Sequence, residues 1–369
     1  MAEPTNTPMP GATPRSGSPG PAGKLTVLHI GDPIKYNPQT YATFSSLFNI
    51  IRPSTEERQR PEFIKALKEK RWGDFHAIFR PFWGTGGEMG KWDAELIELL
   101  PDSVRVFASA GAGFDWADTK LFGEKGVIYC NAGLAAADAV ADFAVAMIIS
   151  TFRHLPWCMG SAITGSPAEF QDCHKRATAE SRNLTGQVLG FVGLGNIGQA
   201  IAKRLGLGFG MKIHYFDVIR KSPDIEGYLS ATFHDTMDSL LAASDCVVLC
   251  TPAGEGALMT AKTISKTKQG ARFVNIARGS LVDDDAVADA LESGRLSAVA
   301  LDVHSTEPDI NPRLLRLSKT SAMLTCHNAG GTLDTHIGFE ELSMKNIMGV
   351  LTGGKAITPV NMHFLKSKM

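Results

Sequence analysis

Three side chains that could do chemistry follow apolar runs, each of which is predicted to be a strand. Arg278 stands in V-N-I-A-R-G-S, Glu307 in L-D-V-H-S-T-E-P, and His327 in L-T-C-H-N-A-G. A guanidinium offers a rigid fork of donors that matches a carboxylate. A histidine can give or take a proton near neutral pH, and a nearby carboxylate raises its pKa by favouring the imidazolium. The carboxyl ends of parallel strands share one sheet edge, so one site that holds a carboxylate and moves a proton is expected.

A glycine fingerprint precedes these segments. Gly193, Gly195 and Gly198 form G-x-G-x-x-G between an apolar strand and an amphipathic helix. In a dinucleotide site, the first glycine allows a tight turn and the second lets the backbone approach the pyrophosphate. The third lets helix and strand pack closely. The backbone N–H groups around Asn196 and Ile197 would then face the phosphates at the positive end of the helix.

Asp217 ends the strand after this helix, 19 residues beyond Gly198. A carboxylate at this place can accept hydrogen bonds from the adenosine ribose hydroxyls and would repel a 2′-phosphate, which favours NAD over NADP. Arg220 and Lys221 follow closely and could pair with such a phosphate, or could form a solvated turn. We therefore expect NAD(H) as the cofactor, with NADP(H) as the alternative.

Apolar runs alternate with helical patterns along most of the chain, which predicts parallel βαβ units. Predicted strands cover residues 25–31, 75–79, 104–110, 190–193, 211–217, 246–251, 272–277, 299–303 and 322–326. Predicted helices cover 62–70, 139–153, 196–207 and 284–294. We therefore expect an α/β protein with two doubly wound, Rossmann-like parallel-sheet domains.

The composition excludes several classes of protein. The 369 residues carry 37 Lys and Arg against 38 Asp and Glu, so no overall charge favours nucleic acid or an anionic membrane. The most apolar run, 139–151, is short and contains Asp142, which argues against a membrane span. The six cysteines include no C-x-x-C pair, and those at 246 and 250 lie in an apolar run. We expect buried thiols, no metal site and a reducing, intracellular compartment.

In their order and spacing these segments resemble the D-isomer-specific 2-hydroxyacid dehydrogenase family. The resemblance runs from about residue 104 to 361 and includes A-G-A-G-F-D at 110–115, the glycine fingerprint, N-I-A-R-G, L-D-V-H-x-x-E-P and the final histidine. The stretches A-G-A-G-F-D-W and L-D-V-H-x-x-E-P further resemble fungal D-mandelate dehydrogenase-type enzymes. The resemblance implies reversible, NAD(H)-dependent reduction of 2-oxo acids to D-2-hydroxy acids.

The same resemblance implies a role for each candidate residue. Arg278 would bind the substrate carboxylate and orient the 2-oxo group. His327 would protonate the carbonyl oxygen as hydride reaches the carbon, while Glu307 would hold the other ring nitrogen and raise its pKa. The backbone N–H groups of Ala110 and Gly111 would also bind the carboxylate. Besides the fingerprint, the implied cofactor contacts are Thr251, Pro252, Ile276, Ala277 and Asp302.

In this family the first domain is discontinuous. The resemblance therefore implies a substrate-binding domain of residues 24–131 and 334–369, an NAD-binding domain of residues 132–333, and an active-site cleft between them. It also implies a homodimer formed through the NAD-binding domain. Residues 1–23 hold six prolines and four glycines with almost no apolar side chain, so we expect a disordered tail.

The sequence defines the substrate less sharply. Phe82 and Trp83 precede a glycine-rich loop, and Phe114 and Trp116 flank the predicted carboxylate-binding turn. These rings could line a pocket for a branched or aromatic acid such as phenylglyoxylate, or could pack in the core or at a dimer contact. Glyoxylate and hydroxypyruvate, the small substrates of many relatives, are the alternative.

Three other functions occur on this fold. An NAD-sensing corepressor would bind the cofactor without turnover and can keep the same three side chains. Formate dehydrogenase needs a glutamine where this chain has Glu307. Phosphoglycerate dehydrogenase needs cationic residues for a phosphate and usually has a longer chain. We therefore expect a dehydrogenase, with a corepressor-like binding protein as the alternative.

The sequence ends in Ser367-Lys368-Met369. A C-terminal S-K-L is a peroxisomal address, and S-K-M differs from it by one apolar residue, a match that chance could also produce. We expect a cytoplasmic protein, with a peroxisomal location as the alternative.

Overall fold

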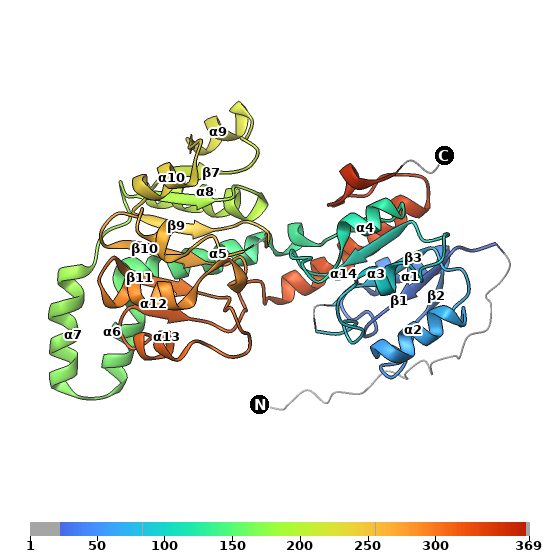
Figure 1. Cartoon of the computed structure of the whole chain (residues 1–369), viewed down its shortest axis with the longest axis horizontal. Helices are drawn as coiled ribbons and strands as arrows, with labels where there is room; N and C mark the ends of the chain where they lie inside the picture. The colour runs from blue at the N-terminus through green and yellow to red at the C-terminus, as the bar shows by residue number, and fades with distance from the viewer. Residues whose placement is uncertain (1–22, 83, 255, 367–369) are drawn as a thin grey trace. The chain divides into compact units, whose positions relative to one another are not determined.

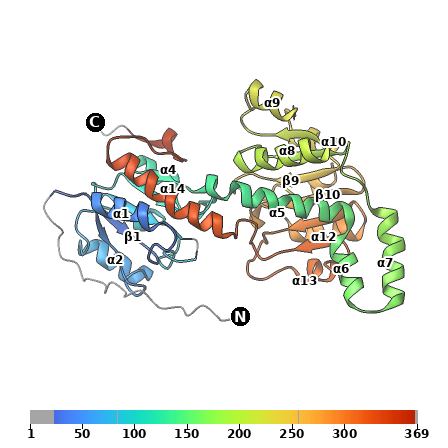
Figure 2. The same cartoon turned by 180° about the vertical axis from the view of Figure 1, so that it is seen from behind.

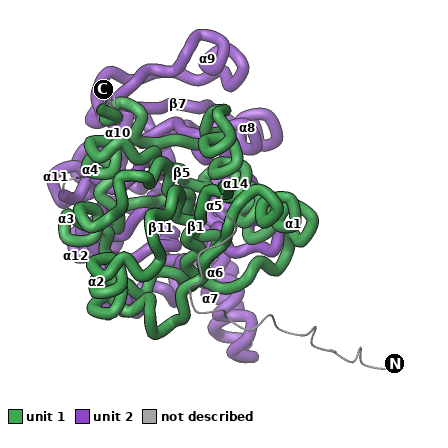
Figure 3. Tube along the Cα trace, turned by 90° about the vertical axis from the view of Figure 1, so that its right-hand side faces the viewer, with its two compact units in different colours: residues 1–135, 336–369 green, residues 136–335 purple. Residues whose placement is uncertain are grey.

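The computed structural model describes residues 23–82, 84–254 and 256–366 (Figure 1). The chain forms two compact units, coloured separately in Figure 3: residues 1–135 with 336–369, called unit 1, and residues 136–335, called unit 2. These divisions lie a few residues from the expected domain boundaries. The tail up to residue 22, Trp83 and the C-terminal tripeptide lie outside the described residues.

Unit 1 contains a five-stranded parallel sheet. Its strands are β1 (Thr26–His29), β2 (Asn49–Ile51), β3 (Ala77–Arg80), β4 (Val106–Ser109) and β5 (Ile128–Cys130). Their order in the sheet is β2-β1-β3-β4-β5, so the winding reverses between β1 and β3. Open α/β sheets bind ligands outside the carboxyl ends of the strands at such a switch point.

Helices cover both faces of this sheet. The helices α2 (Arg60–Lys68), α3 (Ala94–Ile97) and α4 (Thr119–Glu124) pack on one face, and α1 (Pro38–Leu47) and α14 (Leu333–Leu351) on the other. A short 3-10 helix, η2 (Met362–Phe364), follows near the C-terminus. Along β3, Ile78 contacts the first layer while Ala77 and Phe79 contact the second. This alternation buries an apolar strand on both faces, as a doubly wound sheet requires.

Unit 2 contains a seven-stranded parallel sheet. Its strands are β6 (Val188–Val192), β7 (Lys212–Phe216), β8 (Thr232–Phe233), β9 (Cys246–Leu249), β10 (Ala271–Asn275), β11 (Leu296–Leu301) and β12 (Ala322–Leu324). The order is β12-β11-β10-β9-β6-β7-β8, so the switch point lies between β6 and β9. The sheet confirms the predicted α/β class for this half of the chain.

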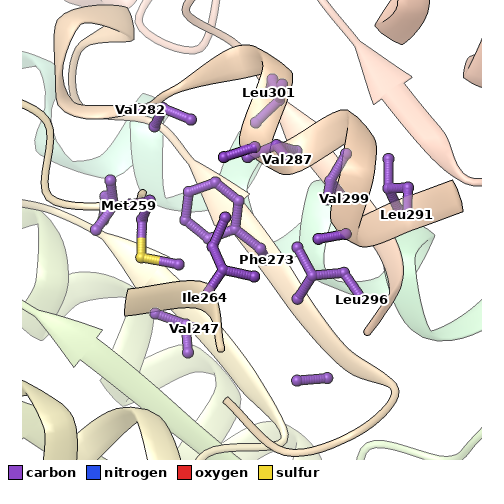
Figure 4. Packing of buried hydrophobic residues seen from close by; sticks show 14 of the residues in the cluster. Val247, Met259, Ile264, Phe273, Val282, Val287, Leu291, Leu296, Val299 and Leu301 are labelled. Carbon is purple, nitrogen blue, oxygen red and sulfur yellow. The ribbon is translucent and has the colours of Figure 1, made fainter. Parts of the chain in front are cut away.

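Helices also cover both faces of the unit 2 sheet. On one face lie α5 (Gly133–Arg153) and α8 (Asn196–Phe209), seen in Figure 2. On the other lie α10 (Met237–Ala243), α11 (Ala261–Ile264) and α12 (Asp284–Glu292), and Figure 4 shows Phe273 of β10 in the middle of this second layer. Asp283 caps the N-terminus of α12, because its carboxylate accepts the Ala286 N–H at 3.1 Å. The remaining helices are α6 (Leu155–Ile163), α7 (Pro167–Glu180), α9 (Pro223–Leu229), α13 (Pro312–Leu317) and the 3-10 helix η1 (Gly279–Leu281).

Helix α5 is longer than the sequence analysis predicts. The apolar run 139–151 lies inside a helix of 21 residues that by length and composition alone could cross a membrane, so the expectation that this run is too short is wrong. Its inner side chains, among them Ala144, Met147 and Ile148, belong to the same core cluster as Phe191 and Val248 of the sheet. An apolar helix of this kind is what a buried layer of an α/β domain needs.

A buried histidine makes the stability of unit 1 depend on pH. His29 ends β1, and neither ring nitrogen has a hydrogen-bond partner among the residues described. Burial, with a smaller contribution from the charge of Arg52, lowers the pKa of His29 to about 3. The unfolded chain takes up this proton below about pH 6.5, whereas the folded chain does so only near pH 3. The free energy of unfolding therefore falls as the pH falls through this window.

We expect this group to remove about 2 kcal/mol of stability between pH 7.5 and pH 5. The variant His29→Leu places an apolar side chain in this buried position and has no proton to bind, so its stability should vary less with pH. Urea unfolding of both proteins at several pH values in this range measures the difference. Parallel pH curves for the two proteins would contradict the assignment.

Candidate active site

The glycine fingerprint follows β6 and leads into α8. Gly193 has a left-handed backbone (φ +91°), and a Cβ there would lie 2.9 Å from a backbone carbonyl oxygen after β9. A Cβ on Gly198 would lie 2.9 Å from the Gly193 carbonyl oxygen, whereas one on Gly195 would meet nothing within 4 Å. Packing therefore requires two of the glycines, and the third leaves open space at the start of α8. The N–H groups of Asn196 and Ile197 stand in this first turn, where a pyrophosphate fits.

Asp217 follows β7 and lies against the glycine turn. Its carboxylate accepts the Leu194 N–H at 2.9 Å and pairs with Lys221 Nζ at 2.9 Å. Burial raises the pKa of Asp217, but the Lys221 bond and the N–H groups of Leu194 and Ile219 outweigh burial and lower the pKa overall. Asp217 is therefore a carboxylate at neutral pH beside the turn that would hold the pyrophosphate.

The two basic residues that follow Asp217 both pair with carboxylates. Arg220 Nε lies 2.9 Å from Glu226 Oε1, and the Arg220 guanidinium carbon lies 5.2 Å from the centre of the Phe233 ring. Lys221 pairs with Asp217 itself. Both positive charges are therefore compensated within their own segment.

The other predicted cofactor contacts follow two neighbouring strands. Thr251 and Pro252 come after β9, and Ile276 and Ala277 come after β10. Because β9 lies next to β6, these residues share the carboxyl edge of the sheet with the glycine turn, across the switch point. This edge carries the residue types and the open helix terminus that a dinucleotide needs.

Arg278 stands three residues after β10, at the N-cap of η1. The buried side chain of Asn275 fixes this turn, because its amide donates to the Arg278 carbonyl oxygen at 2.9 Å and its oxygen accepts the Ala277 N–H at 3.0 Å. A Cβ on Gly279 would clash with the carbonyl group of His304, so this position needs glycine. The close approach places Arg278 next to the segment after β11. The sequence analysis did not identify Asn275 and Gly279 as supports of this turn, although both residues belong to the N-I-A-R-G motif.

His327 and Glu307 form a hydrogen-bonded pair. His327 Nδ1 lies 2.8 Å from Glu307 Oε2, and Glu307 Oε1 accepts the His304 N–H at 2.9 Å. Burial raises the pKa of Glu307, but the His327 bond and the His304 N–H outweigh burial and lower it overall. A charged carboxylate only accepts hydrogen bonds, so Nδ1 carries a proton and Nε2 is the nitrogen suited to proton exchange. The His327 side chain is 31% exposed, which leaves it accessible to a substrate.

Asp302 organises the backbone around this histidine. The Asp302 carbonyl oxygen accepts the His327 N–H at 2.8 Å. The Asp302 carboxylate accepts the N–H groups of Asn328 and Ala329, each at 2.9 Å, and the Thr325 hydroxyl at 2.7 Å. These bonds hold His327 in a left-handed conformation (φ +52°) that is uncommon for a residue other than glycine. The predicted contact with the cofactor stays a prediction, and the structure adds a supporting role that the sequence analysis missed.

Ala110 and Gly111 follow β4 in unit 1. The Ala110 N–H donates to the Arg80 carbonyl oxygen at 2.8 Å, which disagrees with its expected role as a carboxylate donor, since that N–H continues the pairing of β3 with β4. Gly111 has a left-handed backbone (φ +89°), and in the described part of the chain no acceptor takes its N–H. Gly111 is therefore the better candidate of the two for a substrate carboxylate.

Two of the four aromatic residues considered for a substrate pocket pack on the core of unit 1. The ring centres of Phe114 and Trp116 lie 6.1 and 6.0 Å from that of buried Tyr129. Phe82 is half-buried, and Trp83 lies outside the described residues. The structure favours the core alternative for Phe114 and Trp116.

Four other histidines take no part in this arrangement, as expected of histidines with a structural role. His29 and His154 are buried, His174 is exposed on α7, and His214 Nδ1 lies 2.9 Å from His234 Nε2. Within the ranges that the structure describes, no group of three or more His, Cys, Asp or Glu side chains could hold a metal ion.

Comparison with known proteins shows what this site is similar to. Residues 145–329 match the family model described as D-isomer specific 2-hydroxyacid dehydrogenase, NAD binding domain. The 4-methyl-2-oxopentanoate reductase A of Aspergillus oryzae is 34% identical over 303 residues, which cover 82% of this chain and 88% of that protein.

Solved structures agree with this match. The holo form of Rhodotorula graminis D-mandelate dehydrogenase superposes with a TM-score of 0.85 at 36% identity, covering 91% of this chain and 97% of that one. A glyoxylate reductase from Paecilomyes thermophila has a TM-score of 0.81 at 31% identity, covering 92% and 99%. The expected fold class and the expected enzyme class, an NAD-binding oxidoreductase acting on a CH–OH group, are both confirmed. The chain belongs to the D-isomer specific 2-hydroxyacid dehydrogenase family.

Proposed function

We propose that this enzyme reduces 2-oxo acids with a branched or aromatic side chain to D-2-hydroxy acids, and catalyses the reverse reaction. The hydrogen-bonded His327–Glu307 pair carries the proposal, with Arg278 at the same edge of the unit 2 sheet. Bound NADH would supply the hydride. His327 Nε2 would give its proton to the carbonyl oxygen, Glu307 would hold the imidazolium, and the Arg278 fork would hold the carboxylate.

The relatives support a bulky substrate. The Aspergillus oryzae relative is named as a reductase of 4-methyl-2-oxopentanoate, which is branched, and the Rhodotorula graminis structure is a D-mandelate dehydrogenase. A glyoxylate or hydroxypyruvate reductase is the second candidate. The packing of Phe114 and Trp116 against Tyr129 favours this second candidate, because two of the four aromatic rings considered for a bulky substrate then belong to the core of unit 1.

The test is the loss of NADH absorbance with glyoxylate, hydroxypyruvate, 4-methyl-2-oxopentanoate and phenylglyoxylate. We expect kcat/KM for one of the two bulky acids to exceed that for glyoxylate by about tenfold or more, because each buried methylene is worth a few-fold or more in a fitted pocket. The opposite order would replace the proposal with the second candidate. Binding of NADH without turnover of any acid would refute a reductase and support a sensing protein.

We also propose NAD(H) as the preferred cofactor, because Asp217 is charged and both nearby cations are compensated. The variant Asp217→Asn keeps an acceptor for the Leu194 N–H but loses the charge. Its KM for NADH should rise about 10-fold or more, since hydrogen bonds to charged groups are worth about 1.5–3 kcal/mol. Its KM for NADPH should fall.

The matched control for this prediction is Arg220→Ala. The Arg220 guanidinium pairs with Glu226, so this variant should keep the wild-type ratio of KM values for NADPH and NADH. Steady-state kinetics with both cofactors measure the two ratios. An unchanged ratio in Asp217→Asn would remove Asp217 from the cofactor site.

We further propose a homodimer formed through unit 2. Helices α6 and α7 pack on each other through a small cluster of Trp157, Cys158, Cys173 and Ala177, and Figure 1 shows them projecting from the unit 2 sheet. Their outer surface exposes Met159 (67%), Ile163 (85%) and Phe170 (59%). Large apolar side chains grouped on a projecting hairpin are typical of a protein interface.

We expect the double variant Met159→Asp/Ile163→Asp to be a monomer, because it places two charges in the proposed contact. Light scattering after size-exclusion chromatography measures the mass. The control is Ile357→Asp in unit 1, where the side chain is 51% exposed and a dimer should persist. A wild-type monomer, or a dimeric double variant, would contradict the proposed interface.

A further inference from the structure

A buried arginine in unit 1 has no place in the proposed chemistry. Arg80 is the last residue of β3 and is only 8% exposed. Strands β1 and β3 flank the switch point of the unit 1 sheet, and ligands of such sheets bind outside the carboxyl ends of these strands. Burying a guanidinium is costly unless its donors are satisfied, so the contacts of Arg80 indicate which segments it holds in place.

The Arg80 side chain connects three segments at this edge. Its Nε donates to the Gly86 carbonyl oxygen at 3.0 Å, in the glycine-rich loop 84–90. Its Nη1 donates to Ser109 Oγ at 3.4 Å, at the end of β4. The guanidinium carbon also lies 4.7 Å from the centre of the Trp116 ring. Only a planar fork can stack on an indole and bond in two directions at once, so a lysine could not replace it.

Ser109 extends this contact to the turn that follows β4. The Ser109 hydroxyl, which accepts from Arg80, donates to the Ala110 carbonyl oxygen at 3.0 Å. The Arg80 carbonyl oxygen takes the Ala110 N–H at 2.8 Å. Arg80 therefore restrains Ala110 through both its backbone and its side chain.

The Ala110 carbonyl and the Gly111 N–H belong to one planar peptide unit. A hydrogen bond to the carbonyl fixes the plane of this peptide, and it also strengthens the N–H as a donor, because hydrogen bonds in a chain polarise one another. This series of hydrogen bonds starts at the positively charged Arg80 guanidinium and runs through the Ser109 hydroxyl to the Ala110–Gly111 peptide. Its end is the Gly111 N–H, the better of the two expected carboxylate donors.

We propose that Arg80 is a positioning residue for the substrate carboxylate. Acting through Ser109, it orients and polarises the Ala110–Gly111 peptide so that the Gly111 N–H binds the carboxylate of the 2-oxo acid. This inference rests on the proposed function. Arg80 does not touch the reacting atoms, so it should affect binding of the acid more than the chemical step.

The direct test compares Ser109→Ala with Ser109→Thr and Arg80→Lys. Ser109→Ala removes the relay but leaves Arg80 in place, and Ser109→Thr restores a hydroxyl. We expect Arg80→Lys to raise KM for the 2-oxo acid about tenfold or more and Ser109→Ala to raise it several-fold, in line with one or two lost hydrogen bonds. In both variants kcat should stay within about threefold, and Ser109→Thr should recover most of the loss.

A matched control separates positioning from a general loss of packing. Arg272 in unit 2 is also buried, its guanidinium carbon lies 4.3 Å from the centre of the Phe152 ring, and it donates to two backbone carbonyls. Arg272 is the second residue of β10, near the amino end of that strand, whereas Arg80 is the last residue of β3, at the carboxyl end where ligands bind. Arg80→Met and Arg272→Met should both lower the melting temperature, but only Arg80→Met should raise KM.

Binding is also measured without turnover. Oxamate, an unreactive analogue of a 2-oxo acid, is titrated into the enzyme–NADH complex and followed by NADH fluorescence. We expect Kd for oxamate to rise in the same order as KM, with Kd for NADH unchanged. The inference is overturned if Ser109→Ala and Arg80→Lys keep the wild-type Kd, if kcat falls instead of KM rising, or if Arg272→Met gives the same rise. A wild-type enzyme that binds oxamate but reduces no acid refutes the proposed function alone, since the binding series still tests Arg80.

Discussion

Replacing His327 with alanine is expected to lower kcat for 2-oxo acid reduction by about 10³-fold, while the enzyme still binds NADH. A positioned general acid contributes typically 10²–10⁴-fold, and His327 is the group whose Nε2 is suited to proton transfer in this site. His327 follows β12 at one edge of the unit 2 sheet, whereas the glycine turn and Asp217 follow β6 and β7 toward the other edge, so NADH binding there should survive the loss of the imidazole. Stopped-flow reduction with a saturating 2-oxo acid measures the loss, and a fluorescence titration measures NADH binding.

Two variants define what this loss means. Cys326→Ser changes the exposed neighbour of His327 and should keep kcat within about twofold, as surface substitutions usually do. Glu307→Gln keeps the shape of the partner but replaces the charged acceptor at His327 Nδ1 with a neutral one, so kcat for reduction should fall about tenfold or more, since hydrogen bonds to charged groups are worth about 1.5–3 kcal/mol. A His327→Ala enzyme that works at more than a tenth of the wild-type rate would assign the proton to another group.

The charge of Glu307 also makes the stability of the folded chain depend on pH in the acid range. The lowered pKa of Glu307 means that this side chain stays charged at pH values where a free glutamate begins to take up a proton. The part of the stability that depends on this charge is therefore complete above the ordinary pKa of glutamate and is lost only as the pH falls through the lowered value. Glu307→Gln should not show this acid loss, which unfolding by urea at low pH can measure.

The strands that position the site were predictable because they are buried on both faces. Such strands are short continuous apolar runs, and β9, with the sequence C-V-V-L, shows this pattern clearly. Strands β2, β5 and β8 were not predicted. They lie at the edges of their sheets and have three, three and two residues, so they carry too little pattern to separate from a loop.

The site residues were predictable by position but not by partner. Motifs place Arg278, Glu307 and His327 near the ends of strands, and the fold brings those ends to one edge. Hydrogen bonds between distant segments decide the rest. Nothing in the local sequence shows that the Asp302 carboxylate binds the loop after β12, or that the Ala110 N–H is used by β3. Such contacts depend on which loops meet in three dimensions, so the structure is needed to see them.

Replacing Arg278 with lysine is expected to lower kcat/KM for 2-oxo acids by about 10²–10³-fold. A bidentate bond between a guanidinium and a carboxylate uses two parallel N–H donors, and an ammonium on a flexible stem cannot reproduce that fork. A 2-oxo acid held by one point charge also loses the orientation of its carbonyl group toward the catalytic acid, so kcat should fall together with binding.

The fold around this residue should tolerate the change. Asn275 bonds to the backbone carbonyl of Arg278, and Gly279 makes its close approach through the backbone, so neither support uses the guanidinium. The guanidinium Nη1 donates to the carbonyl oxygen of the neighbouring Ala277 at 2.7 Å, a bond that a lysine ammonium can also make. Arg278→Lys should therefore keep the melting temperature and the NADH affinity of the wild type, as should the control Arg295→Lys, whose side chain donates to the Thr267 carbonyl. A drop in kcat/KM that comes with lost NADH binding would indicate damage to the turn after β10. A kcat/KM near the wild-type value would show that a single positive charge is enough, and the carboxylate would then be held mainly by backbone donors such as the Gly111 N–H.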